Sequence, residues 1–351
     1  MLRERHLVQV GEVEGGRCLI IHRALQMHVL LEIDKSPLER QSIYENVRDI
    51  VREAFPRPNI AASGDETTWP AISKYLPHVI SLHAAVMASD PKIDGDLEFV
   101  DILADASRFY FELGVHEEAV PLLRTAESIC DDILPEKPME TKAQYPAILS
   151  LLSICESFAG VQGRNTALSY SQRCVGLQAE YMRDLPLSSV TELDHINVGR
   201  FFLDQGCHLL QIDDFEKAGL SFVKALISYS KAGDEKALDV DLGSAYVFQS
   251  LILVVASAVV PCKKEAVESS DHGYQMVREI LGDESHQTIL VNFLRGLILF
   301  YTGELEASHS IFQDVLAVRR RRLGESNHET LSTKYCLAVT SQRLGDIGKA
   351  E

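Results

Sequence analysis

The sequence has no phosphate-binding loop, because a Gly-x-x-x-x-Gly-Lys-Ser/Thr pattern occurs nowhere in it. The nearest stretch, Gly160 to Thr166, is too short and contains no lysine. Such a loop holds the phosphates of a bound nucleotide with backbone N–H groups and a lysine. Its absence predicts that this chain alone neither binds nor hydrolyses ATP.

Closely spaced metal ligands and catalytic motifs are absent as well. The seven cysteines are scattered, no Cys-x-x-Cys pair occurs, and His116-Glu117-Glu118 has no second histidine four residues on. No Gly-x-Ser-x-Gly sequence marks a nucleophile. We therefore expect no metal, no cofactor and no enzymatic activity, although a triad assembled from distant residues would leave no such signature. Dispersed cysteines without a signal peptide favour a cytoplasmic protein with reduced thiols.

Basic residues are in the minority, with 34 Lys and Arg against 51 Asp and Glu and a formal net charge of −17. Nucleic acid is therefore not an expected partner, because its phosphates require a basic face. One uncharged run, from Leu242 to Cys262, is long enough to cross a bilayer. Polar residues and Pro261 interrupt it where a buried repeat helix is expected, so no membrane partner is predicted.

The sequence does contain a repeat, in which residues 281–289 recur as residues 323–331 after 42 positions. Leu, Gly, an acid, His and Thr all fall in register. A period of this length is typical of a solenoid, in which each helix pair buries its apolar face against its neighbours. Gly282 and Gly324 are expected to end one helix in the left-handed conformation, and the Ser or Asn three positions later to cap the next.

Helical spacing of small and aromatic residues extends the repeat over about six helix pairs within residues 97–351. A small residue such as Gly206 is expected wherever paired helices cross. The last pair begins its second helix only at Ala350, which favours a truncated chain whose uncovered end could self-associate. The joints between paired helices are expected near residues 114, 163, 213, 261, 303 and 345.

This pattern resembles the tetratricopeptide repeat, and its Leu-Gly-acid-x-x-His-x-Thr joint is similar to the kinesin-light-chain type. The resemblance implies an all-α fold, a right-handed superhelix of helix pairs that binds a protein or peptide in its concave groove. Residues 1–96 do not follow the repeat. They are expected to form a helical region derived from a winged helix, with one helix from about Glu39 to Phe55 and another after Trp69.

The resemblance also nominates groove residues, because the first helix of each pair lines the concave face in such repeats. Apolar residues mixed with arginines would suit a peptide with apolar anchors and an acidic group or terminal carboxylate. The alternative is that most of the apolar residues pack against the adjacent unit. The nominated residues are Arg108, Phe111, Arg200, Leu203, Leu210, Phe293, Leu297, Phe300, Tyr301, Tyr335 and Arg343.

The N-terminal part resembles a second family, the fungal NLR-like (STAND) proteins, in the region that follows their NTPase. The likeness rests on Ile21-His22-Arg23, a helix ending in Phe55-Pro56, and Leu76-Pro77-His78-Val79 ahead of the repeats. In that family a winged-helix histidine senses the nucleotide phosphate, and His22 is the matching residue. Ile21 and Arg23 replace the family's Met and Asp. His22 is therefore either a structural histidine or a cofactor-binding sensor in a longer parent protein.

The one basic run, Arg319 to Arg322, has two interpretations. It is a nuclear-localisation or anion-binding patch, or a set of exposed cations that complement a helix C-terminus. The second interpretation is favoured, because Leu323-Gly324 follows directly as a helix stop.

Together these patterns predict a non-enzymatic protein-interaction scaffold, the ligand-sensing or regulatory repeat region of an NLR-like signalling protein. Two alternatives stay open. One is a kinesin-light-chain-like cargo adaptor, and the other is a regulatory fragment of an NTPase whose catalytic domain lies outside this chain.

Overall fold

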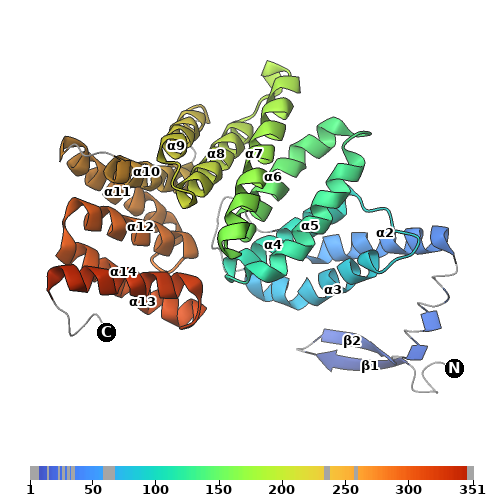
Figure 1. The fold of residues 1–351 in the computed structure, drawn as a ribbon. Helices are drawn as coiled ribbons and strands as arrows, with labels where there is room; N and C mark the ends of the chain where they lie inside the picture. Colours follow the sequence, from blue (N-terminus) through green and yellow to red (C-terminus); the bar gives the residue numbers. More distant parts are fainter. Residues whose placement is uncertain are drawn as a thin grey trace.

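The computed structural model describes residues 8–13, 16–22, 24, 25, 28, 29, 32, 36–57, 68–232, 238–256 and 260–345. From residue 37 onward the described part is an all-α solenoid, as the sequence predicts (Figure 1). The helices are α2 (Pro37–Ala54), α3 (Trp69–Met87), α4 (Leu97–Glu112), α5 (His116–Ile133), α6 (Pro138–Ser157), α7 (Gly160–Asp184), α8 (Glu192–Gln211), α9 (Phe215–Tyr229), α10 (Leu238–Ala256), α11 (Val260–Leu281), α12 (His286–Thr302), α13 (Leu305–Leu323) and α14 (His328–Leu344).

The N-terminal region differs from the helical expectation, because it contains a β-hairpin that lies apart from the helices (Figure 1). Strands β1 (Val8–Val13) and β2 (Gly16–Ile21) pair antiparallel, with Val8 opposite Ile21. The segment Val-Gln-Val-Gly-Glu-Val alternates apolar and other residues with a period of two, which is a strand pattern. The helices expected near residues 39–55 and after Trp69 are confirmed as α2 and α3.

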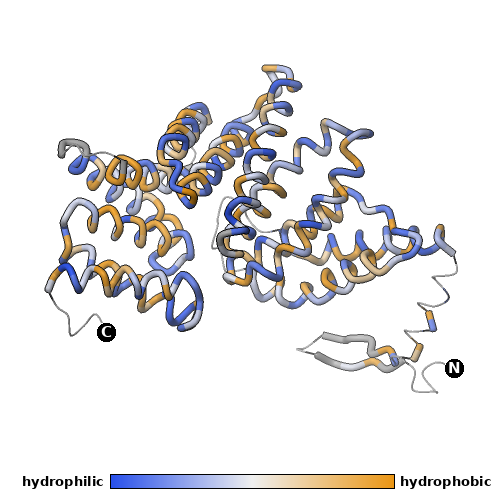
Figure 2. The backbone as a smooth tube through the Cα atoms, viewed as in Figure 1, coloured by the Kyte–Doolittle hydropathy of each residue, from blue (hydrophilic) through white to orange (hydrophobic). Residues whose placement is uncertain are grey.

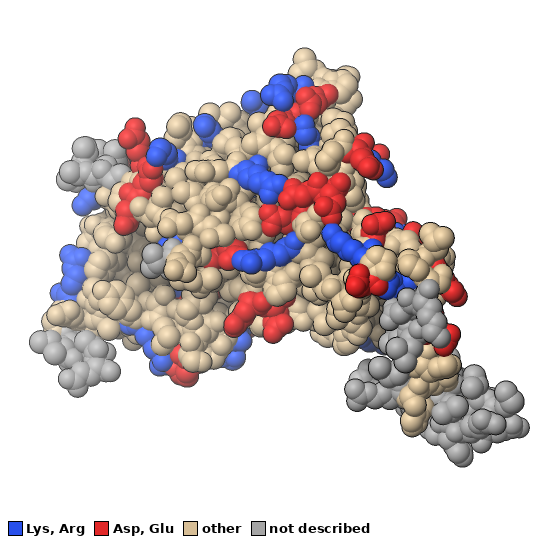
Figure 3. Space-filling model, turned by 45° about the vertical axis from the view of Figure 1, so that its right-hand side comes forward, with Lys and Arg blue, Asp and Glu red and all other residues tan. Residues whose placement is uncertain are grey.

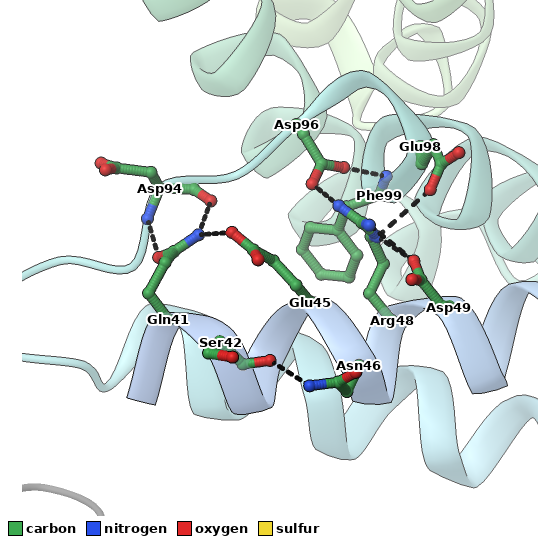
Figure 4. Close-up of polar contacts among 10 residues, drawn as sticks. All are labelled: Gln41, Ser42, Glu45, Asn46, Arg48, Asp49, Asp94, Asp96, Glu98 and Phe99. Atoms are coloured by element: carbon green, nitrogen blue, oxygen red, sulfur yellow. Dashed lines mark hydrogen bonds and ion pairs between the residues drawn. The ribbon is translucent and has the colours of Figure 1, made fainter. Parts of the chain in front are cut away.

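Helix α2 is tied to the start of α4 by polar side chains (Figure 4). The Asp96 carboxylate caps α4 by accepting the Phe99 N–H at 2.9 Å, and it also accepts a hydrogen bond from Arg48 of α2. Gln41 of α2 and the backbone of Asp94 exchange two hydrogen bonds, at 3.1 and 3.0 Å. These contacts extend the stack of helices to the N-terminal side of residue 97.

At both repeated joints a glycine with positive φ ends the helix, but Gly324, with a ψ of 170°, is not in the left-handed helical conformation that the sequence predicts. Gly282 and Gly324 adopt φ values of 76° and 85°, which favour glycine, and Ser285 caps α12 by accepting the Thr288 N–H at 3.1 Å. The joint expected near residue 163 is wrong, since the turn lies at residues 158–159 and Gly163 is inside α7. A Cβ at Gly163 would lie 2.1 Å from the Glu156 carbonyl oxygen, so close helix packing rather than a turn requires this glycine.

The expected joint near residue 261 is also misplaced, because Pro261 lies in the first turn of α11. The residues that connect α10 to α11, 257–259, lie outside the described part of the chain. Helix α10 covers most of the uncharged run, and its side chains lie in the core, including Ala245 and Val247. No helix in the described part is long and apolar enough to span a membrane.

Small residues mark the helix crossings, as predicted. A Cβ at Gly206 would lie 2.3 Å from the Phe222 ring, and one at Gly296 would lie 2.7 Å from the Phe312 ring. Apolar residues recur along the helices of the array (Figure 2), and the buried ones form one cluster over α2–α8, a second over α8–α12 and a third over α12 and α13. The spacing of small and aromatic residues therefore brings paired helices together and fills the space between units.

The array curls far enough for an early unit to contact late ones (Figure 1). The Phe111 ring near the end of α4 lies 5.8 Å from the His286 ring at the start of α12. The Phe158 ring after α6 lies 4.6 Å from the His328 ring at the start of α14. We call this region the closing contact, and define it by Phe111, Gly114, His116 and Phe158 on one side and His286, Leu323, Asn327 and His328 on the other.

Candidate functional site

A strip of charged side chains runs across the first helices of successive units. Arg52 of α2 pairs with Asp105 of α4 at 2.7 Å. Arg200 of α8 pairs with Asp241 of α10, also at 2.7 Å. Between these pairs, Ser150 of α6 donates a hydrogen bond to Asp204 of α8. With Arg108 of α4, these residues form what we call the inner strip: Arg52, Asp105, Arg108, Ser150, Arg200, Asp204 and Asp241.

The inner strip lies on the concave side of the array. Arg108 of α4 interacts electrostatically with Arg200 and Asp204 of α8, although α6 packs between these two helices. Neighbouring helix axes lie about 8–10 Å apart, so a straight stack would separate α4 from α8 by roughly 16–20 Å. Curvature toward this face brings the three side chains within range of one another.

Arg108 is the arginine of the inner strip that has neither a hydrogen bond nor an ion pair with any residue in the described ranges. Its side chain is half-buried. Burial lowers the pKa of Arg108, and the positive charge of Arg200 lowers it further, whereas Glu112 and Asp105 raise it. A guanidinium stays charged in proteins, so its five N–H donors can bind a carboxylate from outside.

Asp204 beside it is held in an unusual state for a carboxylate. Burial raises the pKa of Asp204 to about 6, against the hydrogen bond from Ser150 and the charges of Arg200 and Arg108, which lower it. The strip therefore combines one arginine that lacks a bonded partner in the described ranges with one aspartate that is costly to ionise. This combination favours an incoming anion at Arg108 over an incoming cation.

A second group of nominated residues forms an exposed aromatic surface at the far end of the array. The Arg343 guanidinium lies 4.6 Å from the centre of the Phe300 ring, and Tyr301 packs edge-on against Phe300 at 5.5 Å. Tyr301 is 49% exposed, and Tyr335 of α14 is 72% exposed. These positions on α12 and α14 offer apolar and cationic surface to a ligand.

The remaining nominated residues pack within the array, as the alternative interpretation holds for apolar positions. Leu203 is only 7% exposed in the core, so we leave it out of the proposed groove. Phe293 packs between Phe312, at 5.6 Å, and the Arg319 guanidinium, at 4.7 Å. Three others are half-buried, with Leu210 and Leu297 against the core and Phe111 in the closing contact.

The basic run is engaged within the protein. Arg319 is 2% exposed and pairs with Glu329 at 2.8 Å, which corrects the expectation that it is an exposed cation. Arg321 pairs with Glu284 at 2.6 Å, and Arg320 with Glu325 at 2.9 Å. The run lies at the C-terminal end of α13, where the sequence places it, but its partners are specific. It holds the joints before α12 and α14 together.

Charges of both signs are interspersed on the face of the molecule seen in Figure 3, where Lys and Arg lie beside Asp and Glu. His22 is exposed at the end of β2, where its ring nitrogen accepts the Ala24 N–H at 3.2 Å. Within the described ranges, no group of three or more His, Cys, Asp or Glu side chains is placed to hold a metal ion.

The fold and inner strip define an α-solenoid of helix pairs with a polar concave face. Residues 295–329, which span the second half of α12, all of α13 and the start of α14, match the family model of the tetratricopeptide repeat. Comparison with curated protein sequences gives no match.

Solved structures of similar proteins are distant in sequence. One is BtubC (BKLC) from P. vanneervenii, with 13% identity, a TM-score of 0.46, and coverage of 67% of this chain and 86% of that one. Another is a putative kinesin light chain from P. anserina with nearly identical TPR-like repeats. It shows 15% identity and a TM-score of 0.38, and covers 63% of this chain and 95% of that one.

Sequence reasoning found Arg108 and Arg200 of the inner strip but missed Arg52, the acids and the serine. Asp204 follows Arg200 by four residues, which places both on one face of α8. Asp241 falls one repeat later in a first helix. The signal was therefore present as spacing, but the pairing across helices depends on curvature, which the spacing does not contain.

Proposed function

We propose that this chain is a non-enzymatic protein-interaction scaffold that binds an extended peptide along its concave face. The observation that carries the proposal is Arg108, a half-buried arginine without a hydrogen-bonded partner in the described ranges, on a strip whose other arginines are paired. An acidic side chain or a terminal carboxylate of a peptide supplies the missing partner. The exposed surface at Phe300, Tyr301 and Arg343 suits an aromatic or apolar anchor of the same peptide.

Fluorescence anisotropy with matched peptide libraries tests this function. Each labelled peptide is presented with a free and an amidated C-terminus, and with Glu or Gln at each position. Binding should favour the acidic members, and Arg108→Gln should weaken it by about 10- to 100-fold, as expected when a charge-assisted hydrogen bond is lost. Arg183→Gln, at an exposed position near the end of α7, is the matched control. Equal affinities for both variants would contradict the proposal.

A finer version of this proposal sets the array in an NLR-like signalling protein of the fungal cytoplasm, as its ligand-sensing or regulatory region. The similarity around His22 supports it, as does the β-hairpin directly before that residue, since strands of this kind occur in a winged helix. The reading frame upstream of residue 1 tests the assignment. A phosphate loop there would support it, and a coding region without one would refute it.

The alternative is a cargo adaptor similar to kinesin light chains. The observation that favours it is the repeated Leu-Gly-acid-x-x-His-x-Thr joint. Co-sedimentation of the full chain with a motor heavy chain would distinguish the two, because the NLR-like role requires no motor partner.

A further inference from the structure

Three helices begin with a histidine and point these residues into the closing contact. His116 is the first residue of α5, His286 of α12 and His328 of α14. The rings of His116 and His328 lie 6.1 Å apart, and Phe158 lies against both, stacked on His116 at 4.0 Å. Each histidine therefore sits at the positive end of a helix dipole, where a proton on its ring is unfavourable.

The contact buries the His116 ring, whereas His286 is half-buried and His328 is exposed at the edge of the contact. His116 is 7% exposed, and both of its ring nitrogens are buried without a hydrogen-bond partner in the described ranges. The gap lined by Glu112, His286, Arg319 and Glu329 measures about 10 Å³, the lower limit for a single water. A Cβ at Gly114 would already lie 3.3 Å from Leu323. A proton on His116 would thus be neither solvated nor hydrogen-bonded.

The charged groups around the histidines do not offset this cost. Helix α4 contributes Glu112, α13 contributes Arg319 and Arg322, and α14 contributes Glu329. Arg319 already pairs with Glu329 at 2.8 Å, which leaves His286 at a longer 3.8 Å from that carboxylate. No acidic side chain in the described ranges bonds to the rings of His116 or His328.

We propose that the closing contact is a proton-sensitive latch, closed while His116, His286 and His328 are neutral and opened when they take up protons. Opening separates the α4–α5 turn and Phe158 from the joints before α12 and α14. It widens access to the concave face without unfolding any helix. This proposal does not depend on the peptide-binding function, because it rests on the packing of the three histidine rings.

The direction of the pH dependence follows from the burial of the histidines. Burial lowers the pKa of His116 to about 4, and the neighbouring histidines lower it further, against the attraction of Glu329. Burial also lowers the pKa of His286, and the partial burial of the His328 ring lowers its pKa in the same direction. A ring freed by opening regains its ordinary pKa of about 6.5, so the closed state is favoured above that pH and loses stability as the pH falls below it. For His116 alone, the closed-to-open ratio should fall about 30-fold between pH 8 and pH 5.

Small-angle X-ray scattering of the full chain from pH 8 to pH 5 tests the latch. The radius of gyration should increase as the pH falls, while far-UV circular dichroism keeps its helical signal. The double variant His116→Phe/His328→Phe retains aromatic packing on Phe158 but cannot take up protons there, and should stay compact at pH 5. His78→Phe, at an exposed position on α3, should expand as the wild type does.

Three results would overturn the latch. The first is a wild-type chain whose dimensions do not change down to pH 5. The second is a double variant that expands as the wild type does, because another group such as Asp204 would then drive the change. The third is loss of helical signal together with expansion, which would mean unfolding. The single variant His116→Phe, with a smaller but measurable retention of compactness, provides the same test if the double variant does not fold.

Discussion

Arg319 gives the sharpest test of how the last units are held together. Its guanidinium is almost fully buried, pairs with Glu329, donates to the Glu329 carbonyl oxygen at 3.1 Å and to the Thr333 hydroxyl at 2.8 Å, and lies over Phe293. Arg319→Ala leaves the Glu329 carboxylate buried without its nearest cationic partner. Breaking a buried pair in this way costs about 3–5 kcal/mol. Arg321→Ala removes an ion pair whose two side chains are largely exposed, which costs at most about 1 kcal/mol.

Urea unfolding followed by circular dichroism measures both changes in the free energy of unfolding. The Arg319→Ala midpoint should shift several times further than the Arg321→Ala midpoint. The double variant Arg319→Leu/Glu329→Leu should recover much of the loss, since it leaves no unpaired charge in the interior. Equal shifts for the two single variants would show that Arg319 does not hold the joint, and would refute the reasoning.

Four further predictions concern stability, pH dependence, amide exchange and nucleotide binding. Gly206→Ala should lower the free energy of unfolding by about 1–3 kcal/mol, because its Cβ would meet Phe222. Gly176→Ala should raise it by about 0.5–1 kcal/mol, because its Cβ on α7 would meet nothing within 4 Å. Equal thermal shifts for the two variants would contradict the helix crossing assigned to Gly206. Asp204→Asn should be more stable than the wild type at pH 7.5, and the difference should shrink toward pH 4. The reason is that a folded-state pKa of about 6, raised by burial, makes the ionised aspartate costly as the pH rises; denaturant titrations at both pH values would show it, and a constant difference would count against it. Amide exchange should be faster in the second half of α14, from Tyr335 on, than in α8 or α12. Tyr335 and Arg343 are exposed in this half of the helix, and only the start of α14 joins the closing contact. Strong protection throughout α14 in a monomer would contradict the prediction. Isothermal titration with ATP and ADP should detect no binding, and saturable micromolar affinity would refute the inference from the missing phosphate loop.

Much of the fold follows from local patterns. Gly282 and Gly324 end helices, and Gly206 marks a crossing, because each of these roles depends on a few neighbouring residues. The burial of Arg319 also had a local signal. It follows the buried Ile311 by eight residues and Val315 by four, so it lies on the apolar face of α13 despite its charge. This periodicity was missed because four identical residues in a row do not indicate which of them lies on the apolar face of the helix.

The closing contact and the inner strip were beyond sequence reasoning for a different reason. His116 and His328 are far apart in the chain, and the distance between them depends on small rotations accumulated over α5 to α13. The residues near either histidine do not determine the total of these rotations. The same holds for Arg108 and Asp204, which approach only because the stack curves around α6. Helix ends and helix crossings are determined by short segments of sequence, whereas the curvature is determined by the packing of the whole array.

The closing contact changes how the units share their free energy. In an open solenoid each unit is stabilised by its immediate neighbours, and the end units fray first. Here a unit near the start of the array contacts the units near its end, so each of these units is stabilised by more than its immediate neighbours in the sequence. Damage to α14 should then weaken α4 and α5 directly, without passing through the helices between them. A protein built from local pieces thereby gains cooperativity from one pair of surfaces.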